Sequence, residues 1–456
     1  MAIRNFWSMA AAAVGFRLVL VLFGGDLHLA SRPEVSTPLT SIRRRKRSLA
    51  PLPPRPRLEL CCVVAVIGLI ACFPVCFAVA EGYWLKQASM SPYSGSMYHG
   101  SPLLLLVLGP LTNKRSVGHH DHIYCSLIFV AVDFIAAMLI RATGRRLQIA
   151  RNRNLKSLEL TEAVSNSVNV SAGDIASLIY LWNPWAIVTC VGSCTSPIEN
   201  LMVVIMIYGA CSRLAPLAAF GYVMATHLSL YPAILIVPII LLLGYGPDAP
   251  PTKVFRIKSS SASKTDVSDN DKSSSSRDVQ QFLWKPVFHF ILWMLFWTFY
   301  VLLLSSIVLN KVGGLQEMFE KTYGFILTVK DLSPNIGVLW YFFAEVFDFF
   351  RSFFLIVFNM NIVFMVLPLA IRLKHRPCFL AFIYTAIVAI LKSYPSVSRG
   401  DSALYLGLLG LFANELAEMQ FTFFLFFGYI GVSLLSPVMH NLWIWRVSPS
   451  PILPLS

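Results

Sequence analysis

Long apolar stretches recur along the chain from Phe6 to Trp443, and short polar turns rich in proline and glycine separate them. Such stretches are typical of helices that cross a membrane, because a helix satisfies its own backbone hydrogen bonds in lipid. The pattern predicts an all-α, polytopic helical membrane protein with about 10 to 12 spans. The expected spans are Phe6–Phe23, Ile123–Ile140, Ile175–Val191, Leu201–Ala225 with an interruption at Pro216, Leu228–Gly244, Val287–Leu309, Gly337–Phe358, Ile362–Ile371, Phe379–Leu391, Ala403–Ala413 and Phe421–Trp443.

The composition supports this class of protein. Hydrophobic residues make up 56% of the chain and charged residues 13%, about half the charged share of a soluble globular protein. The mean hydropathy is +0.66. The net charge of +14 lies largely in short stretches between the predicted helices, as positive-inside sorting produces. No stretch interleaves basic and aromatic residues on a soluble face, so we expect no nucleic-acid partner.

A polar linker divides the chain into two membrane halves. Residues 247–281 are rich in Ser, Asp and Lys and lack an apolar period, which predicts disorder. The N-terminal half covers residues 1–246 and the C-terminal half covers residues 282–446, with an atypical tail at 447–456. The basic stretch Arg145–Glu162 is amphipathic and predicts a surface helix.

The most informative polar residues lie in Asp331–Phe350, a segment otherwise aromatic enough to sit in lipid. At about 100° per residue, a helix places Glu345 and Asp348 on one face and Phe343 and Phe347 close to the opposite face. An ionisable group at membrane depth costs several kcal/mol unless it faces protein, water or a ligand. The acidic face therefore predicts a partner, with an amphipathic helix at the membrane surface as the alternative.

Other charged and polar residues in apolar stretches also require partners. Arg17 lies within the first predicted span and is expected to face protein. Asn414, Glu415 and Glu418 also require partners. The turn Leu391–Tyr405 offers a cation, a phenol and a carboxylate at the membrane interface, which are Lys392, Tyr394 and Asp401. Lys392 could equally be an ordinary anchor that reaches toward lipid phosphates.

Two further segments carry candidate chemistry. Ser91–Leu106 is a turn-rich loop in which Tyr93, Tyr98 and His99 could stack on a sugar or a headgroup, or could simply anchor the next helix. The run His119–His122 does not predict a metal site, because adjacent side chains point in different directions.

Catalytic arrangements are poor. The chain contains no GxSxG elbow, no HExxH sequence and no phosphate-binding glycine loop. The nine cysteines form no CxxC pair, and those at Cys190, Cys211 and Cys378 fit small hydrophobic residues in helices. We therefore expect no metal and no cofactor, and any catalysis by this chain would have to use carboxylates at a membrane face.

Several longer segments are recognisable together: SPYSGSMYHGSPLL, YLWNPW, HLSLYP, DLSPNIGVLWYFFAE, LPLAIRLKHRP and LKSYPS. They resemble the phosphatidylinositol-glycan class U family, and plant members most closely. The resemblance covers roughly Ser91–Trp445, with a weaker match over Phe6–Arg44. It implies a non-catalytic membrane subunit of the glycosylphosphatidylinositol (GPI) transamidase of the endoplasmic reticulum, which attaches GPI anchors to proteins.

The resemblance also implies partners and a site. The partners would be the GPI lipid and the other transamidase subunits, namely a cysteine-protease-like catalytic subunit and its membrane partners. The residues expected to face the lipid or the other subunits are Asn335, Tyr341, Phe342, Phe343, Glu345, Phe347, Asp348, Lys392, Tyr394 and Asp401.

A second resemblance concerns the scaffold. SPYSGSMYHGSPLL is also similar to a segment of GPI mannosyltransferases, which implies an inactive glycosyltransferase-C scaffold. Those enzymes carry an acidic pair after the first helix, whereas Arg32–Ser36 holds a single acid. The alternative function is an active mannosyltransferase that uses dolichol-phosphate-mannose. A transporter would predict inverted repeats, and the sequence contains no internal repeat.

The chain departs from the family pattern in three places. Residues 45–80 intervene between two segments that the family joins directly, and they read as an aberrant insert from a retained intron or a mispredicted gene. The insert is apolar enough to span a bilayer, and one extra span would invert every following helix. Ser398–Arg399 is a smaller insertion, and the tail after Arg446 replaces a longer hydrophobic C-terminus.

Overall fold

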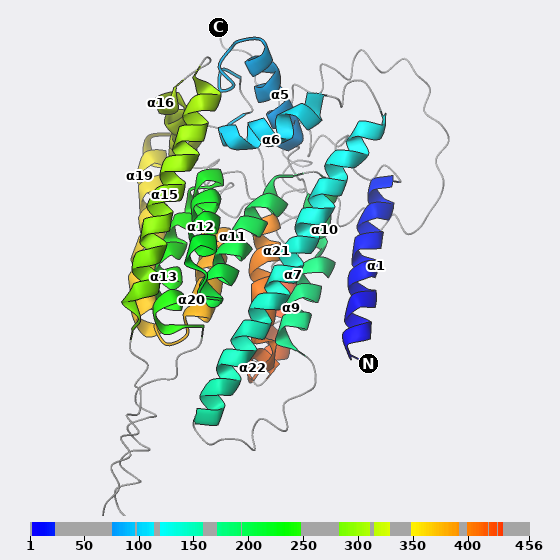
Figure 1. Cartoon of the computed structure of the whole chain (residues 1–456), viewed down its shortest axis with the longest axis vertical. Coiled ribbons are helices and arrows are strands. Elements are labelled where there is room, and N and C mark those ends of the chain that lie inside the picture. The colour runs from blue at the N-terminus through cyan, green and yellow to red at the C-terminus, as the bar shows by residue number, and fades with distance from the viewer. Residues whose placement is uncertain are drawn as a thin grey trace, which may run out of the picture.

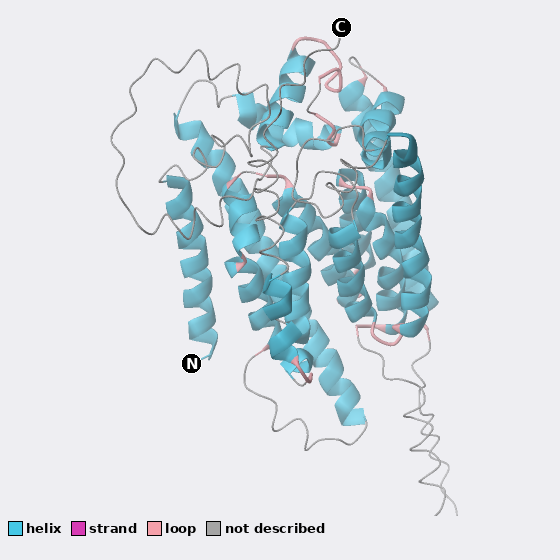
Figure 2. Cartoon of the chain, turned by 180° about the vertical axis from the view of Figure 1, so that it is seen from behind, coloured by secondary structure: helices cyan, strands magenta, loops and turns pink. Residues whose placement is uncertain are grey.

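The described part of the structure, a computed structural model, consists of helices joined by turns and loops (Figure 2). It describes residues 2–22, 75–95, 98–113, 119–157, 171–192, 194–247, 282–310, 314–328, 348–391, 399–417, 419–425 and 427–431. Within these ranges no strand occurs. The predicted all-α class is confirmed.

The main helices of the N-terminal half are α1 (Ala2–Leu22), α5 (Val75–Gln87), α6 (Pro102–Asn113), α7 (His119–Ser157), α9 (Ala172–Trp182), α10 (Pro184–Val191), α11 (Ser196–Cys211), α12 (Ala215–Leu228), the short 3₁₀ helix η2 (Tyr231–Leu235) and α13 (Ile236–Tyr245). Those of the C-terminal half are α15 (Trp284–Leu309), α16 (Leu315–Met318), the π-helical turn η4 (Phe319–Gly324), α17 (Phe325–Thr328), α19 (Asp348–Arg372), α20 (Pro377–Leu391), α21 (Arg399–Leu409), η5 (Gly410–Phe412) and α22 (Ala413–Ala417).

Three helices in the described ranges are long and apolar enough to cross a membrane by themselves: Ser126–Arg153 of α7, α15, and Phe349–Arg372 of α19. The pair α9 and α10 would make a fourth span, bent by 51° where Pro184 follows Asn183. Other apolar helices, including α11 and α20, have only 10 to 17 residues. The chain is therefore a multi-pass membrane protein, and the count of about 10 to 12 spans stays a prediction.

Small residues allow the central helices to pack closely. Gly144 of α7 lies directly against Gly173 of α9, where an added Cβ on either residue would meet the backbone of the other helix. Gly209 and Gly221 allow the same close approach between α11 and α12. Small residues at such crossings are the usual device in membrane bundles, since lipid supplies no hydrophobic driving force between helices.

The helices α15 and α19 lie at one edge of the bundle and expose large apolar side chains (Figure 1). Phe288 and Phe299 of α15 are 65% and 69% exposed, and Phe364 of α19 is 68% exposed. Side chains of this kind are compatible with surrounding lipid. This edge of the bundle therefore contrasts with its centre, where residues such as Met206 and Leu242 are fully buried.

Three predicted boundaries were wrong. Leu201–Ala225 is not one interrupted span but two helices, α11 and α12, because the chain turns at residues 212–214 and Arg213 has a φ of 56°. Gly337–Phe358 and Ile362–Ile371 were predicted as two spans. From Asp348 onward they form one helix, α19, which contains Pro368 and ends at Arg372. The basic stretch from Arg145 to Ser157 continues α7 and is not a separate surface helix.

The sequence pattern also missed α5 and α6, which lie together beyond one end of the bundle (Figure 1). The C-terminal end of α1 and the N-terminal end of α7 point toward this same end, so α1 and α7 run in opposite directions (Figure 1). The insert itself, at 45–80, lies almost wholly outside the described residues, and its origin stays a prediction.

Candidate functional site

Most of the predicted site residues lie outside the described part of the chain. This holds for Asn335, Tyr341, Phe342, Phe343, Glu345, Phe347, Lys392 and Tyr394. Asp348 is the first residue of α19, and only its backbone is described. Asp401 is described fully and lies in the first turn of α21.

Asp401 lines a small cavity between four elements of the bundle, which we call the Asp401 cavity. The elements are α11, α20, α21 and the segment around η2. The cavity has a volume of about 40 Å³. Its lining consists of Glu199, Asn200, Val203, Ser229, Pro232, Leu235, Thr385, Val388, Asp401 and Leu404. Five of these side chains are polar, and two of the five are carboxylates.

Local structure explains how these polar groups reach the cavity. Glu199 lies in the first turn of α11, which begins with Ser196 and Pro197, and it accepts a hydrogen bond of 3.2 Å from the Thr195 hydroxyl. Asp401 occupies the equivalent position in α21. Carboxylates are favoured at helix N-termini because the backbone N–H groups there carry partial positive charge. Ser229 ends α12 at the turn before η2.

A buried polar network continues from the cavity into the bundle. The Asn200 amide donates to the Tyr180 hydroxyl at 3.5 Å, and that hydroxyl donates to Asp133 at 2.9 Å. Asp133 in turn faces Arg17 of α1, with Nη2 and Oδ2 3.6 Å apart and both side chains 1% exposed. The prediction that Arg17 faces protein is therefore confirmed, and its partner is a residue of α7.

The sequence analysis missed Asp133, Glu199 and Asn200. A signal was available for each, since all three are polar residues in or beside apolar stretches, where such groups require partners. Their spacing could not reveal the arrangement, because Arg17, Asp133 and Asn200 are far apart along the chain. The motif YLWNPW, whose first residue is Tyr180, was recognised only as part of a resemblance.

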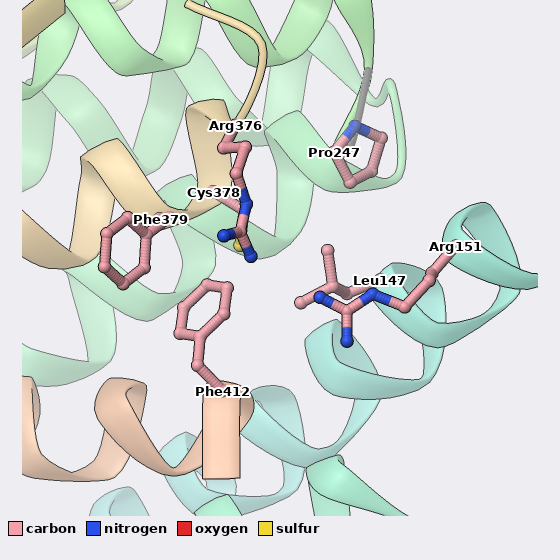
Figure 3. A pocket seen from close by; sticks show the side chains of 7 residues that line it. All are labelled: Leu147, Arg151, Pro247, Arg376, Cys378, Phe379 and Phe412. Atoms are coloured by element: carbon pink, nitrogen blue, oxygen red, sulfur yellow. The ribbon is translucent and has the colours of Figure 1, made fainter. Parts of the chain in front are cut away.

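A second ionic cluster lies at the opposite end of the bundle from α5 and α6, on α7, on α22 and just before the start of α20. Glu415 accepts hydrogen bonds from Arg151 and from Arg376, so it has the partners that the sequence predicted it would need. Arg376 lies beside Phe379, Phe412 and Cys378, and Arg151 lies across the same small pocket beside Leu147 (Figure 3). The Arg376 guanidinium lies 5.3 Å from the centre of the Phe379 ring. The cluster joins helices from both halves of the chain.

The loop after α5 is an anchor in the described structure. Tyr93 and Tyr98 are buried and stack on each other with ring centres 5.7 Å apart, and their hydroxyls donate to the backbone carbonyls of Gly100 and Ser101. Burial raises the pKa of both phenols above the ordinary value for tyrosine, so both remain neutral donors. His99 stacks on Phe325 at 3.5 Å. These contacts agree with the anchoring alternative for this loop.

No group of three or more metal-ligating side chains occurs among the described residues. The described cysteines, Cys190, Cys194, Cys211 and Cys378, are buried and carry free thiols, in agreement with their predicted role as small hydrophobic residues. The cavity lining thus offers hydrogen-bond acceptors and charge for a polar ligand. It does not offer a nucleophile paired with a histidine base.

Comparison with known proteins identifies the family. The family model described as "GPI transamidase subunit PIG-U" matches residues 76–449. The human protein named "GPI-anchor transamidase component PIGU" is 30% identical over 382 residues, which cover 81% of this chain and 78% of the human one. The Schizosaccharomyces pombe "GPI transamidase component GAB1 homolog" is 25% identical, and Saccharomyces cerevisiae "GPI transamidase component GAB1" is 22% identical; each match covers 80% of this chain and 76% of the yeast protein. The chain therefore belongs to the PIG-U family of GPI transamidase subunits.

Proposed function

We propose that this chain is a non-catalytic subunit of GPI transamidase in the endoplasmic reticulum membrane, where it holds the GPI lipid and helps assemble the complex. The observation that carries the proposal is the Asp401 cavity, a set of five polar side chains inside an apolar helical bundle. Polar groups at membrane depth are costly unless they serve a ligand, a partner or a structural pair. A lipid with a polar glycan headgroup supplies a ligand of suitable character.

The distribution of basic residues gives the orientation. Arg151 and Arg376 share Glu415, so the C-terminal end of α7 and the start of α20 lie at the same end of the bundle. The C-terminal part of α7, toward this same end, also carries Arg145, Arg146 and Arg153. Because positively charged residues gather on the cytoplasmic side of membrane proteins, we assign this end to the cytosol.

The depth of the Asp401 cavity follows from helix geometry. Glu199 precedes Cys211 by twelve residues along α11, about 18 Å at 1.5 Å per residue. The Cys211 side chain contacts Cys378, close to Arg376 at the cytosolic end. In a hydrocarbon layer of about 30 Å the cavity then lies in the lumenal half. This is the side on which a lumenal protein substrate would meet the GPI headgroup.

The acidic face of Asp331–Phe350 belongs to the same proposal. We assign Asn335, Tyr341, Glu345 and Asp348 to contacts with the GPI headgroup or with other subunits. Phe342, Phe343 and Phe347 would contact acyl chains or partner helices. Lys392 and Tyr394 precede Asp401 by nine and seven positions along the chain, and we assign them to act with it.

Rescue of cells that lack the endogenous subunit tests the proposal. The readout is the surface level of a GPI-anchored reporter, normalised to the amount of complex recovered with this chain. Glu345→Ala, Asp348→Ala and Asp401→Asn are each expected to lower the reporter. Glu320→Ala, which removes an exposed acid from η4, is the matched control and should rescue fully.

Each outcome has a defined meaning. Full rescue by both Glu345→Ala and Asp348→Ala would overturn the assignment of the acidic face. Failure of the unmodified chain to rescue, in spite of normal expression, would overturn the proposed function itself. Mannose transfer from dolichol-phosphate-mannose by the purified protein would overturn the non-catalytic assignment in favour of a mannosyltransferase.

A further inference from the structure

We propose that the turn between α19 and α20 binds the headgroup of an anionic phospholipid, whose acyl chain lies along the exposed face of α19. We call residues 372–376 the basic turn, and its basic side chains are Arg372, Lys374, His375 and Arg376. The inference goes beyond the proposed function and uses only its assignment of this end of the bundle to the cytosol. Two features that meet at one place carry it: uncompensated positive charge and an apolar surface one leaflet long.

The positive charge of the basic turn is only partly compensated. Arg376 donates a hydrogen bond to Glu415. No carboxylate among the described residues forms an ion pair with Arg372 or Lys374, and both of these side chains are exposed. Partial burial, and then the nearby charge of Lys374, lower the pKa of His375 below the ordinary histidine value, so the imidazole is neutral. The turn therefore presents two cations, Arg372 and Lys374, that can pair with an anion.

An exposed apolar stripe of α19 leads directly to the basic turn. Its side chains recur every three or four residues, which places them on one face of the helix. They are Met360, Phe364, Leu367 and Ile371, which are 42%, 68%, 67% and 73% exposed. From the first to the last of these residues the helix rises about 16 Å, at 1.5 Å per residue. This length is close to the depth of one leaflet in a hydrocarbon layer of about 30 Å. The stripe therefore offers an acyl chain a continuous apolar surface that ends at the two cations.

The opposite face of α19 fixes this geometry. Val366, Leu369 and Leu373 pack against the core of the bundle, and the Tyr384 hydroxyl of α20 donates to the Val366 carbonyl oxygen. Backbone hydrogen bonds close the turn: the Leu373 N–H donates to the Leu369 carbonyl, and the Arg376 N–H donates to the Leu373 carbonyl. The apolar stripe and the basic turn thus belong to one packed element, and such preorganisation lowers the cost of binding.

Ordinary features of membrane helices explain these residues only in part. The helix dipole favours a cation in the last turn of a helix, which accounts for Arg372. Positive-inside sorting accounts for basic residues at the cytosolic end. Neither effect requires an exposed apolar stripe to end at exposed cations, yet Arg372 follows Ile371 directly. A ligand with an anionic head and an apolar tail satisfies both surfaces at once, and basic residues at the cytosolic face attract anionic lipids.

Photocrosslinking in the assembled complex tests the inference. The complex is purified through a tag on this chain into phosphatidylcholine nanodiscs. The nanodiscs contain a trace of phosphatidylserine that carries a photoreactive group on its acyl chain, and the matched probe is phosphatidylcholine with the same acyl chain. Peptide mapping measures the crosslinks to residues 360–371. At trace levels the yield follows the affinity of each lipid for this face.

We expect phosphatidylserine to crosslink to the stripe about tenfold or more efficiently than phosphatidylcholine. Arg372→Gln and Lys374→Gln should each lower that preference about fivefold, the effect of one basic residue near an anionic headgroup. The double variant should abolish it. Arg145→Gln combined with Arg146→Gln is the matched control, because it removes two exposed charges from the C-terminal part of α7 and should leave the preference unchanged. The comparison of the two lipids in the unmodified chain requires no variant, so a variant that fails to assemble leaves the test intact.

Equal crosslinking of the two lipids in the unmodified chain overturns the inference. So does an unchanged preference in the double variant of the basic turn, or an equal loss in the α7 control, which would mean that general surface charge attracts the lipid. If added glycerophosphoserine, a soluble headgroup, removes the crosslinks of phosphatidylserine, the site binds a soluble anion and the lipid assignment is wrong. If neither lipid crosslinks to the stripe, another subunit covers it and the assignment is also wrong. None of these results depends on the rescue assay, which tests the proposed function separately.

Discussion

The ion pair between Arg17 and Asp133 is predicted to hold α1 against the rest of the bundle. The two charged atoms are 3.6 Å apart, and both side chains are 1% exposed. At an effective dielectric constant of about 20, unit charges at this distance attract by about 5 kcal/mol. Removing one member of a buried pair typically costs about 3–5 kcal/mol, because the remaining charge is left buried without compensation.

Arg17→Met is therefore expected to lower the free energy of unfolding by about 3–5 kcal/mol. In that variant, Asp133 would keep its hydrogen bonds from the Tyr180 hydroxyl and the Cys190 thiol but would lose the guanidinium that balances its charge. Asp133→Leu should cost a similar amount, since it leaves the guanidinium buried. The double variant should lose less stability than the two single variants added together, by about 2 kcal/mol or more. The reason is that it buries no unpaired charge.

Equilibrium unfolding of the purified chain in mixed micelles, followed by titration with a denaturing detergent, measures these differences. Arg153→Met is the control, because it removes an exposed arginine from α7, the helix that carries Asp133. It should change the free energy of unfolding by no more than about 0.5 kcal/mol. The reasoning is refuted if Arg17→Met is as stable as Arg153→Met. It is also refuted if the two single effects add without coupling.

Two further variants test the packing of the bundle, and one measurement tests the gene structure. Gly173→Ala should destabilise the chain by about 1–3 kcal/mol, since the new Cβ would lie 2.5 Å from the Arg141 carbonyl oxygen. Gly15→Ala is the control: its Cβ would have no neighbour within 4 Å, so it should be neutral in the same unfolding assay. Glu415→Gln, which weakens the contacts of Glu415 to Arg151 and Arg376, should lower stability by about 1–3 kcal/mol, and an unchanged midpoint would contradict that role. Sequencing of transcripts between the codons for Arg44 and Glu81 should find a form that joins the two family segments directly, and finding only the longer form would contradict the predicted insert.

The helical class and the need for polar partners could be predicted from sequence, but the partners could not. Apolar length alone predicts helices such as α15, because a helix is the structure that satisfies its backbone in lipid. The cost of burying charge predicts that Arg17 and Glu415 must be paired. The pairs form with residues 116 and 264 positions away. No local pattern specifies such distant contacts, since they depend on how the helices pack.

The predicted helix boundaries were wrong where the local backbone conformation, and not the apolar run, decides where a helix ends. The turn between α11 and α12 occupies three residues, and Arg213 adopts a positive φ, which few non-glycine residues do. The sequence predicted a break between Phe358 and Ile362, yet α19 continues through both this point and Pro368 to Arg372. A proline is tolerated inside a membrane helix when neighbouring groups satisfy the freed carbonyl. Hydropathy averages over such details and therefore misplaces the ends.

The Asp401 cavity illustrates how a site can be missed even when one of its residues is found. The sequence analysis selected Asp401 for its place in a polar turn and gave it neighbours from that same turn. The structure instead sets it beside Glu199, which begins a different helix about 200 residues earlier. Both acids occupy first helical turns, where a carboxylate is favoured even without a ligand. The helix-end preference thus explains each acid singly, whereas their convergence on one cavity with Asn200 and Thr385 does not follow from it. That convergence depends on how α11, α20 and α21 pack together, which no local pattern in the sequence specifies.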